Sequence, residues 1–424
     1  MAIKKSPSKN TPNASAPRRP SSENAKTTVV VKQAIVNVFF DGTLNNYYNA
    51  NKRNDNTSYG NDLSNVARMW VPIRNEKSKC AIYIDGMGTT RFQNDTTDGY
   101  AYGDGDTGVM ARADSAFAQI HQKVWDANGQ TIPPVVRINV YGFSRGAATA
   151  RTFVHWFNTE RQQRFKDNAD KWQGVNAQVN FVGLFDTVSS YAPKEDRDSL
   201  TSKVPKKGAF DNDVSQLHLN FSSGYAKKVV HITAGDEHRA NFSLTNIASA
   251  KGLGIGYELE IPGSHSDVGG SYHQEEIEKK PMDEDMAHFV LQKGWFEQGD
   301  LKPHYDGTRV TRIGTRKVFG QYHKVGLAIM VDKANHYGKA GIPNGIFEVN
   351  TSKPDGKDVQ EIQGRLREFA QNEANNVRWS IDSYKSESYA KWFRRWFLHF
   401  SAELPDIIGA NKPAPNYKRK LIPG

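Results

Sequence analysis

The stretch VVRINVYGFSRGAATAR, residues 135–151, decides the fold class. It begins as a nearly continuous apolar run, which is typical of a strand buried on both faces of a sheet. A G-x-S-x-G pattern follows at 142–146, and small residues then favour the start of a helix. In a strand, turn and helix of this kind the pattern exposes a serine hydroxyl on a strained turn. The alternative is an ordinary Gly-rich turn, but the flanking runs favour Ser144 as a nucleophile.

Five other short apolar runs also end in polar, Gly-containing loops. They lie at 27–43, 80–89, 179–188, 227–238 and 257–270. Helical segments such as 114–127 and 147–158 separate them. This alternation predicts an α/β fold, an open and mainly parallel sheet with helices on both faces. In such sheets the functional groups gather at the carboxyl ends of the strands.

The alternation of short apolar runs with helical segments ends at about residue 273. Residues 273–299 have acidic residues first and apolar residues at helical spacing, so they predict a helix, and 358–400 predicts one or two more. We therefore expect a catalytic core over 27–272 and a helical cap and C-terminal region over 273–424, packed on that core.

The composition is that of a globular protein with a basic tail. Of the 424 residues 37 % are hydrophobic and 11 % are aromatic, enough for a sizeable core. The net charge is +10, but residues 1–26 hold six Lys or Arg against one Glu and are expected to be disordered. No basic stretch interleaved with aromatic residues stands out elsewhere, so we expect no nucleic-acid partner.

The cysteine content, the N-terminus and the apolar runs of the sequence bear on the cellular location of the protein. Cys80 excludes an intramolecular disulfide and is expected to be a buried strand residue rather than a nucleophile. The N-terminus lacks the apolar centre of a secretory signal peptide. No run approaches the roughly 18 apolar residues of a transmembrane helix. If the protein leaves the cell, we expect a route other than the general one.

A serine nucleophile needs a general base, and His265 is the strongest candidate among the 12 histidines. It lies in a polar, Gly-rich loop directly after the strand run 257–261, which places it at the same sheet edge as Ser144. His231 lies inside a strand run and is expected to be a packed core residue. His238 is a lesser candidate for the base.

Asp186 is the candidate for the orienting acid because it closes the strand run 179–185. The resulting order of Ser, Asp and His along the chain is that of α/β hydrolases. Two other acids compete for this role. Asp236 follows another strand run, whereas Asp267 lies two residues beyond His265 and is expected to brace the histidine loop.

The oxyanion of an acyl-transfer reaction needs two backbone donors. The amide of Arg145 is one candidate because it lies at the predicted helix start. The amides of Gly42 and Thr43 supply the second candidate, and Asp41 is placed to orient their loop. A plain Asp-Gly turn is the alternative, and the loop at 83–89 competes for the same role.

Residues 98–108 hold three Asp and several Gly, which raises the question of a metal site. Their spacing does not match a calcium loop, so we interpret the stretch as a flexible active-site loop. No Cys and His cluster supports zinc, and we expect no metal. The predicted triad chemistry requires no cofactor, and a calcium requirement is left open.

An aromatic segment at 389–400 has two interpretations. Trp392, Phe393, Trp396 and Phe397 form a broad face with basic residues around it. Such a face suits contact with an anionic membrane surface. It equally suits an amphipathic helix packed on the core, which is the commoner use of aromatic residues at helical spacing.

Several motifs occur in an order that resembles one family. They are VFFDGTLNN, YIDGMGT, YGFSRGAATAR, GLFDTVSS, GDEHRANF and IPGSHSDVGGSY, followed by a helical segment at 322–338. Together they resemble the GFSRG-type α/β hydrolases, which include the lipase effectors of the type VI secretion system. The resemblance covers about residues 33–340. This chain departs from the family in Ser264, where a branched apolar residue is frequent, and in Gly326, where Pro is usual.

The resemblance implies a phospholipase A that acts on membrane phospholipids through a Ser-Asp-His triad. By position the nucleophile falls on Ser144, the acid on Asp186 and the base on His265. It also implies synthesis in a bacterial cytoplasm, delivery on a secretion spike or adaptor protein to the periplasm of a rival cell, and a cognate immunity protein. Two alternatives remain open: an esterase or thioesterase with another substrate, and a non-catalytic interaction protein that keeps the fold.

Overall fold

A computed structural model describes residues 32–424 apart from 54, 56, 195–213, 307–308, 354–355 and 405–410. The disordered tail predicted over 1–26 lies outside the described residues. Residues 32–424 form one compact unit. Its described helices include none that is long and apolar enough to cross a membrane.

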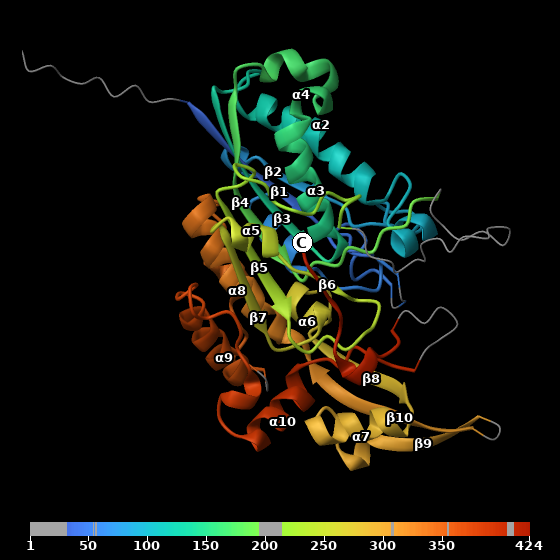
Figure 1. The fold of residues 1–424 in the computed structure, drawn as a ribbon. Coiled ribbons are helices and arrows are strands. Elements are labelled where there is room, and N and C mark those ends of the chain that lie inside the picture. The colour runs from blue at the N-terminus through green and yellow to red at the C-terminus, as the bar shows by residue number, and fades with distance from the viewer. Residues whose placement is uncertain are drawn as a thin grey trace, which may run out of the picture. The chain divides into compact units, whose positions relative to one another are not determined.

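A six-stranded sheet forms the centre of this unit (Figure 1). All neighbouring strands are parallel, in the order β2-β1-β3-β4-β5-β7. Every one of the six apolar runs identified in the sequence supplies a strand, so the predicted α/β fold is confirmed. The strands are β1 (Gln33–Phe40), β2 (Ala81–Ile84), β3 (Val135–Phe143), β4 (Asn176–Phe185), β5 (Lys228–Ala234) and β7 (Gly256–Ile261).

Helices cover both faces of the sheet, and each face has its own hydrophobic core (Figure 1). On one face α2 (Val109–Ala127) and α3 (Arg145–Thr159) pack through Phe117 and Phe153. On the other face lies α8 (His323–Lys333), which is buried nearly all round. A helix that is apolar on every side must be enclosed by protein. Here α9 (Gly356–Phe369) covers the side of α8 that turns away from the sheet.

A second, three-stranded antiparallel sheet corrects the helix predicted over 273–299. Its order is β8-β10-β9, with β8 (Glu275–Met282), β9 (Leu301–Asp306) and β10 (Arg309–Phe319). The one α-helix within the predicted range is α7 (Glu284–Lys293), and Asp283 caps it by accepting a hydrogen bond from Met286 N. The C-terminal third is therefore a mixed α and β region rather than a helical cap.

The other described elements are short or lie near the C-terminus. The segment 358–400 holds α9 and α10 (Glu387–Phe397), which confirms the prediction of one or two helices there. A two-residue strand, β11 (Leu421–Ile422), pairs in parallel with β6 (Leu244–Thr245). The remaining α-helices of the described residues are α1 (Asn65–Trp70), α4 (Arg161–Arg164), α5 (Ala248–Gly252) and α6 (His265–Gly269).

Candidate active site

Ser144 occupies a strained turn between β3 and α3. Its φ of 57° and ψ of −129° are unfavourable for a residue with a side chain. Such strain costs on the order of 1–3 kcal/mol and persists only where the surroundings enforce it. Here the amide of Ser144 donates to Phe185 O at 3.0 Å, and its carbonyl accepts from Val188 N at 3.3 Å. The neighbouring strand therefore holds the turn in place.

The two glycines of the G-x-S-x-G pattern are required by space. A Cβ on Gly142 would lie 2.4 Å from the carbonyl oxygen of Gly146. A Cβ on Gly146 would lie 2.4 Å from Phe40 O and 2.3 Å from Asp41 O. These neighbours are backbone atoms that cannot move aside, so only glycine lets the helix start approach the end of β1.

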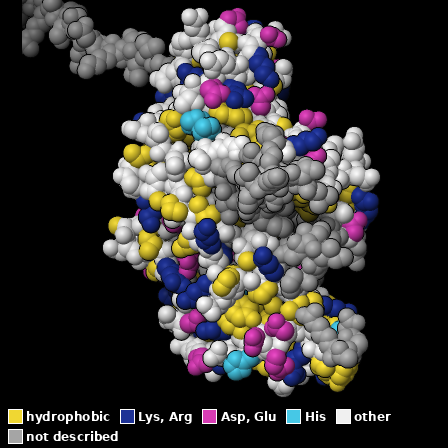
Figure 2. Space-filling view, turned by 45° about the vertical axis from the view of Figure 1, so that its right-hand side comes forward, with side chains coloured by type: hydrophobic (Ala, Val, Ile, Leu, Met, Phe, Trp, Pro, Cys, Tyr) yellow, Lys and Arg dark blue, Asp and Glu magenta, His cyan; other side chains and the backbone are white. Residues whose placement is uncertain are grey.

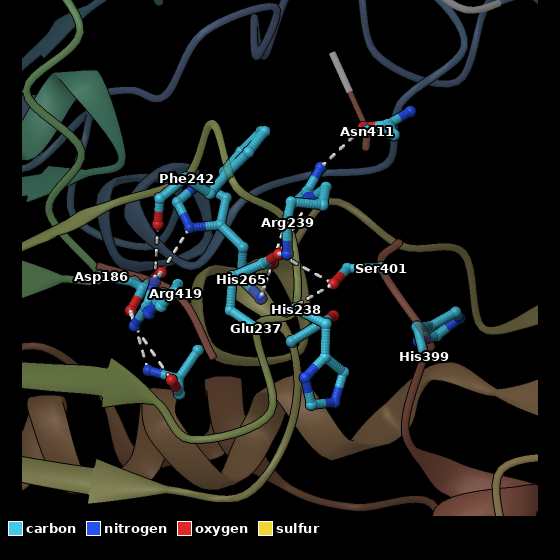
Figure 3. A network of polar contacts seen from close by, with 12 residues as sticks. Asp186, Glu237, His238, Arg239, Phe242, His265, His399, Ser401, Asn411 and Arg419 are labelled. Atoms are coloured by element: carbon cyan, nitrogen blue, oxygen red, sulfur yellow. Dashed lines mark hydrogen bonds and ion pairs between the residues drawn. The ribbon is translucent and has the colours of Figure 1, made fainter. Parts of the chain in front are cut away.

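Asp186 and His265 form a hydrogen-bonded pair beside this turn (Figure 3). Asp186 Oδ2 lies 2.6 Å from Nδ1 of His265. The imidazole packs in a tilted arrangement against Phe143, the residue before Ser144, with 4.6 Å between ring centroids, and it meets Phe242 in a T-shaped contact at 5.1 Å. Ser144, Asp186 and His265 thus lie at the carboxyl ends of β3, β4 and β7, on one edge of the sheet. Because Nδ1–H donates to the carboxylate, Nε2 is the free base of the ring.

The charges around this pair favour an ionised acid and a neutral base. Burial raises the pKa of Asp186, but the guanidinium of Arg419 and the hydrogen bond from His265 outweigh burial and lower it well below its usual range. Burial lowers the pKa of His265, and the attraction of Asp186 only partly opposes this. A neutral imidazole at neutral pH is what a general base requires.

Arg419 is a site residue that the sequence did not reveal. Its Nη1 donates to Asp186 Oδ2 at 2.8 Å, and its Nη2 donates to Oδ1 at 2.6 Å. A third donor to the same carboxylate is the amide of Ala234, at 2.8 Å from Oδ1. The side chain of Asp186 is fully buried, so all its acceptor capacity is met by protein groups.

Glu237 is a second residue that the sequence did not reveal. It is buried, and its Oε2 accepts from the backbone amide of His265 at 3.2 Å. Burial raises its pKa, but the charge and hydrogen bonds of Arg239 outweigh burial and lower it to about 2. The hydroxyl of Ser401 donates to its Oε1 at 2.8 Å. Glu237 therefore anchors the start of α6, where His265 lies.

The rival residues serve other contacts. Asp236 accepts from Gly263 N at 2.8 Å, and Asp267 accepts from Ser264 N at 2.9 Å. Asp267 also lies 2.7 Å from Nδ1 of His399, so it fixes α6 from its own first turn. Of the candidate acids, only Asp186 is hydrogen-bonded to the imidazole of His265.

The rival histidines are also engaged elsewhere. The ring of His238 faces the carbonyl of Tyr417, 2.8 Å from its Nδ1, which takes it away from Asp186. His231 is buried in β5, where Nδ1 pairs with Glu258 at 2.9 Å and Nε2 accepts from Thr187 N at 3.0 Å. It therefore supports the turn that follows Asp186.

The predicted oxyanion loop differs from expectation at one residue. The amide of Gly42 donates to Asp41 Oδ1 at 2.8 Å, so it is not available to an oxyanion. The amides of Thr43 and Arg145 donate to no other group in the described part of the chain. The Arg145 guanidinium links the two residues that carry these amides, since its Nε donates to Thr43 Oγ1 at 2.8 Å. Thr43 and Arg145 therefore remain the candidate donors.

The side chain of Asp41 orients this loop by accepting from Gly42 N. It is buried, and burial raises its pKa to about 6 despite hydrogen bonds that include one from the hydroxyl of Tyr83, 2.5 Å from Oδ2. The competing loop at 83–89 packs against the same segment, because Leu44 N donates to Met87 O at 3.1 Å. The second loop thus supports the first.

The stretch 98–108 packs beside the nucleophile. It contains a single π-helical turn, Asp98–Tyr102, and the carbonyl of Tyr100 accepts from the Arg145 guanidinium. Burial lowers the pKa of Arg145 to about 10.

Within the described ranges no three His, Cys, Asp or Glu side chains are grouped so as to hold a metal ion.

The aromatic face of α10 is mostly core, which corrects the membrane interpretation for two residues. Phe393 and Phe397 are 0 % and 2 % exposed because they pack on Tyr322 and Phe319. Trp392 is 38 % exposed, and Trp396 is half-buried. Figure 2 shows hydrophobic side chains among charged ones on the lower half of one face, at the height of α7 and the three-stranded sheet in Figure 1.

Part of the chain is similar to a known protein family. Residues 155–293 match the family model of the catalytic domain of Tle1-like phospholipase effectors of the type VI secretion system. This match confirms the family resemblance. The Tle1-like region contains Asp186 and His265, and Ser144 lies just before it.

One solved structure extends the likeness in fold beyond residues 155–293. The Tle1 effector bound to the VgrG spike of the type 6 secretion system is similar with a TM-score of 0.59 and 19 % identity, over 97 % of this chain and 99 % of that one. An uncharacterized protein from Pseudomonas aeruginosa has a TM-score of 0.42 and 18 % identity, over 86 % of this chain and 53 % of that one. No curated protein matches the chain. The first likeness shows a common fold along nearly the whole chain.

Proposed function

We propose that this chain is a serine hydrolase that cleaves the carboxylic ester bonds of membrane phospholipids, as a phospholipase A. The observation that carries the proposal is the Asp186–His265 pair beside the strained turn of Ser144. A serine in a strained strand-to-helix turn, a base within reach and an acid that orients the base are the parts of this chemistry. The match to a phospholipase effector family supports the choice of substrate.

In the proposed reaction Ser144 Oγ attacks the ester carbonyl while Nε2 of His265 takes its proton. Asp186 holds the ring in the required tautomer and stabilises the imidazolium that forms. The imidazolium gives the proton to the leaving lysolipid alcohol, and a water then releases the fatty acid from Ser144 by the same steps in reverse. The amides of Arg145 and Thr43 are proposed to stabilise the oxyanion, by roughly 3 kcal/mol each.

The test uses vesicles of phosphatidylglycerol and phosphatidylethanolamine with the wild type and Ser144→Ala. We expect the wild type to release fatty acid and Ser144→Ala to lose that activity by at least about 10³-fold, because the nucleophile is gone. Release would be measured by mass spectrometry, with thermal melting as a check of folding. Hydrolysis of a soluble ester without any release from vesicles would favour an esterase with another substrate. A wild type that is inactive on both would contradict the enzyme proposal.

We further infer that the protein leaves the producing cell on a spike of the type VI secretion system, acts in the periplasm of a target cell and is neutralised by an immunity protein. The inference is supported by the effector family and by the similar fold of a Tle1 effector that was solved with a VgrG spike. We expect the purified chain to co-elute with the spike protein of the same bacterium in size-exclusion chromatography. Separate elution at micromolar concentrations of both would contradict this delivery route.

A further inference from the structure

The last residues of the chain, 411–424, form what we call the C-terminal strap. The strap runs along residues 238–249, the connection between β5 and β7. It is fixed at its start, where Ala414 N donates to His238 O at 2.8 Å, and in its middle by the pairing of β11 with β6. At its end Gly424 O accepts from Ser249 N at 2.9 Å. Hydrogen bonds along its whole length thus hold this segment on the core.

Arg419 lies in the middle of the strap and points at the catalytic acid (Figure 3). Its side chain is only 6 % exposed. Besides its two bonds to Asp186, it donates to Ala234 O at 2.9 Å, so its fork is fixed by the end of β5 as well. Figure 3 shows Arg419 and His265 meeting the same carboxylate from different sides.

This arrangement gives Arg419 two effects on the pair. A buried carboxylate is strongly destabilised unless a counter-charge accompanies it, and the guanidinium supplies that charge at hydrogen-bond distance. The two parallel bonds also fix the plane of the carboxylate, and hence the direction in which Oδ2 accepts from His265 Nδ1. A lysine would keep the charge without the two-pronged geometry.

We propose that Arg419 is a positioning residue for hydrolysis and that the C-terminal strap completes the active site. Arg419 is hydrogen-bonded to Asp186 rather than to Ser144, and it acts through Asp186 on the orientation and basicity of His265. The inference rests on the proposed function, because it takes Ser144, Asp186 and His265 as a working triad.

The charge of Arg419 also affects the pH profile of the reaction. Three other charged groups influence His265: Asp186 at its Nδ1, Glu237 at its backbone amide, and Arg239, which is paired with Glu237. Removing the positive charge of Arg419 leaves Asp186 more negative toward the imidazole. The imidazolium is then favoured, the pKa of His265 rises, and the acid limb of kcat/KM moves to higher pH.

A cavity of about 410 Å³ borders Arg419 and permits a rescue experiment. It is lined by strap residues, including Tyr417 and Lys418, and by both acidic and basic residues, such as Asp236 and Arg378. If Arg419 is cut back to glycine, guanidinium ion added far below its denaturing range has a space from which to reach Asp186.

The test compares Arg419→Met, Arg419→Lys and Arg419→Gly with Lys420→Met. The last is the matched control, because it removes a charge from the adjacent, exposed strap residue, whose carbonyl still accepts from Leu244 N. Three readouts are the labelling of Ser144 by a fluorophosphonate, kcat/KM against pH with a soluble ester, and the melting temperature. We expect Arg419→Met to lose about 100-fold in kcat/KM, the scale of a misplaced catalytic group.

The acid limb of Arg419→Met should also shift upward, Arg419→Lys should lie between it and the wild type, and guanidinium should restore Arg419→Gly in part. Lys420→Met should match the wild type. Wild-type labelling and an unmoved acid limb in folded Arg419→Met would overturn the positioning role alone. Variants that all unfold, with no restoration by guanidinium, would overturn it too, since the role would be structural. An unlabelled wild type would instead contradict the proposed function.

Discussion

Replacing His265 with glutamine is expected to lower kcat for a soluble ester by about 10⁶-fold, the scale seen when the base of a serine hydrolase is removed. Glutamine is polar and similar in reach, but it cannot take the proton of Ser144. Residual hydrolysis then depends on substrate binding and the oxyanion donors alone. The matched control is His288→Gln, which changes an exposed histidine on α7 and should leave the rate as it is.

The double variant Ser144→Ala/His265→Gln makes this prediction sharper. Nucleophile and base act as a unit, so the loss in the double variant should equal that in either single variant rather than their product. Initial rates with a fluorogenic ester, corrected for the uncatalysed reaction, would measure this. Losses that multiply would mean that Ser144 and His265 act independently, which would contradict a shared proton transfer.

The central sheet was predictable because its signals are local. A strand buried on both faces reads as a continuous apolar run, and six such runs gave six parallel strands. The nucleophile turn was equally local, since two glycines and a serine at fixed spacing lie between a strand and a helix. Once the strands are parallel, their carboxyl ends meet at one edge, which is why Asp186 and His265 could be chosen from sequence order.

Strand β8 was mistaken for a helix because charged residues lie on both of its faces, the exposed one and the buried one. Its residues carry charges that pair with the neighbouring strand, as Glu275 does with Lys317 at 2.7 Å and Glu278 with Arg316 at 2.6 Å. Acidic residues before an apolar run also resemble the first turn of a helix. The information that decides for a strand lies in β10, about 40 residues further along.

Arg419 could not be predicted either, because its partner is distant in the sequence. It is one basic residue in a basic tail, and its partner Asp186 precedes it by 233 residues. Glu237 was next to a histidine that drew attention to the segment, yet only the folded chain shows that the carboxylate meets the amide of His265. Supporting contacts of this kind come from the tertiary fold and have no characteristic spacing.

Asp186→Asn is expected to lower kcat by about 10⁴-fold, because the amide favours the wrong tautomer of His265. We also expect Asp186→Asn to lower the free energy of unfolding. The same change in a triad whose acid has no arginine partner would not leave a buried charge uncompensated. Arg419 would keep its charge in a buried place after losing its counter-charge. Breaking a buried ion pair from one side typically costs about 3–5 kcal/mol of the free energy of unfolding. Urea unfolding at pH 7 would measure this loss.

The double variant Asp186→Asn/Arg419→Met separates the two effects, because it removes the stranded charge but not the defect in the triad. It should regain part of the lost stability and none of the lost activity.

The stability difference between the wild type and Asp186→Asn should also depend on pH. The folded-state pKa of Asp186 is lowered, so its contribution is complete above the unfolded value of about 3.9 and declines as the pH falls below it. An Asp186→Asn variant as stable as the wild type at pH 7 would show that the Asp186–Arg419 pair carries no net stabilisation. A desolvated cation cannot lose the carboxylate to which it is hydrogen-bonded without cost unless water reaches it.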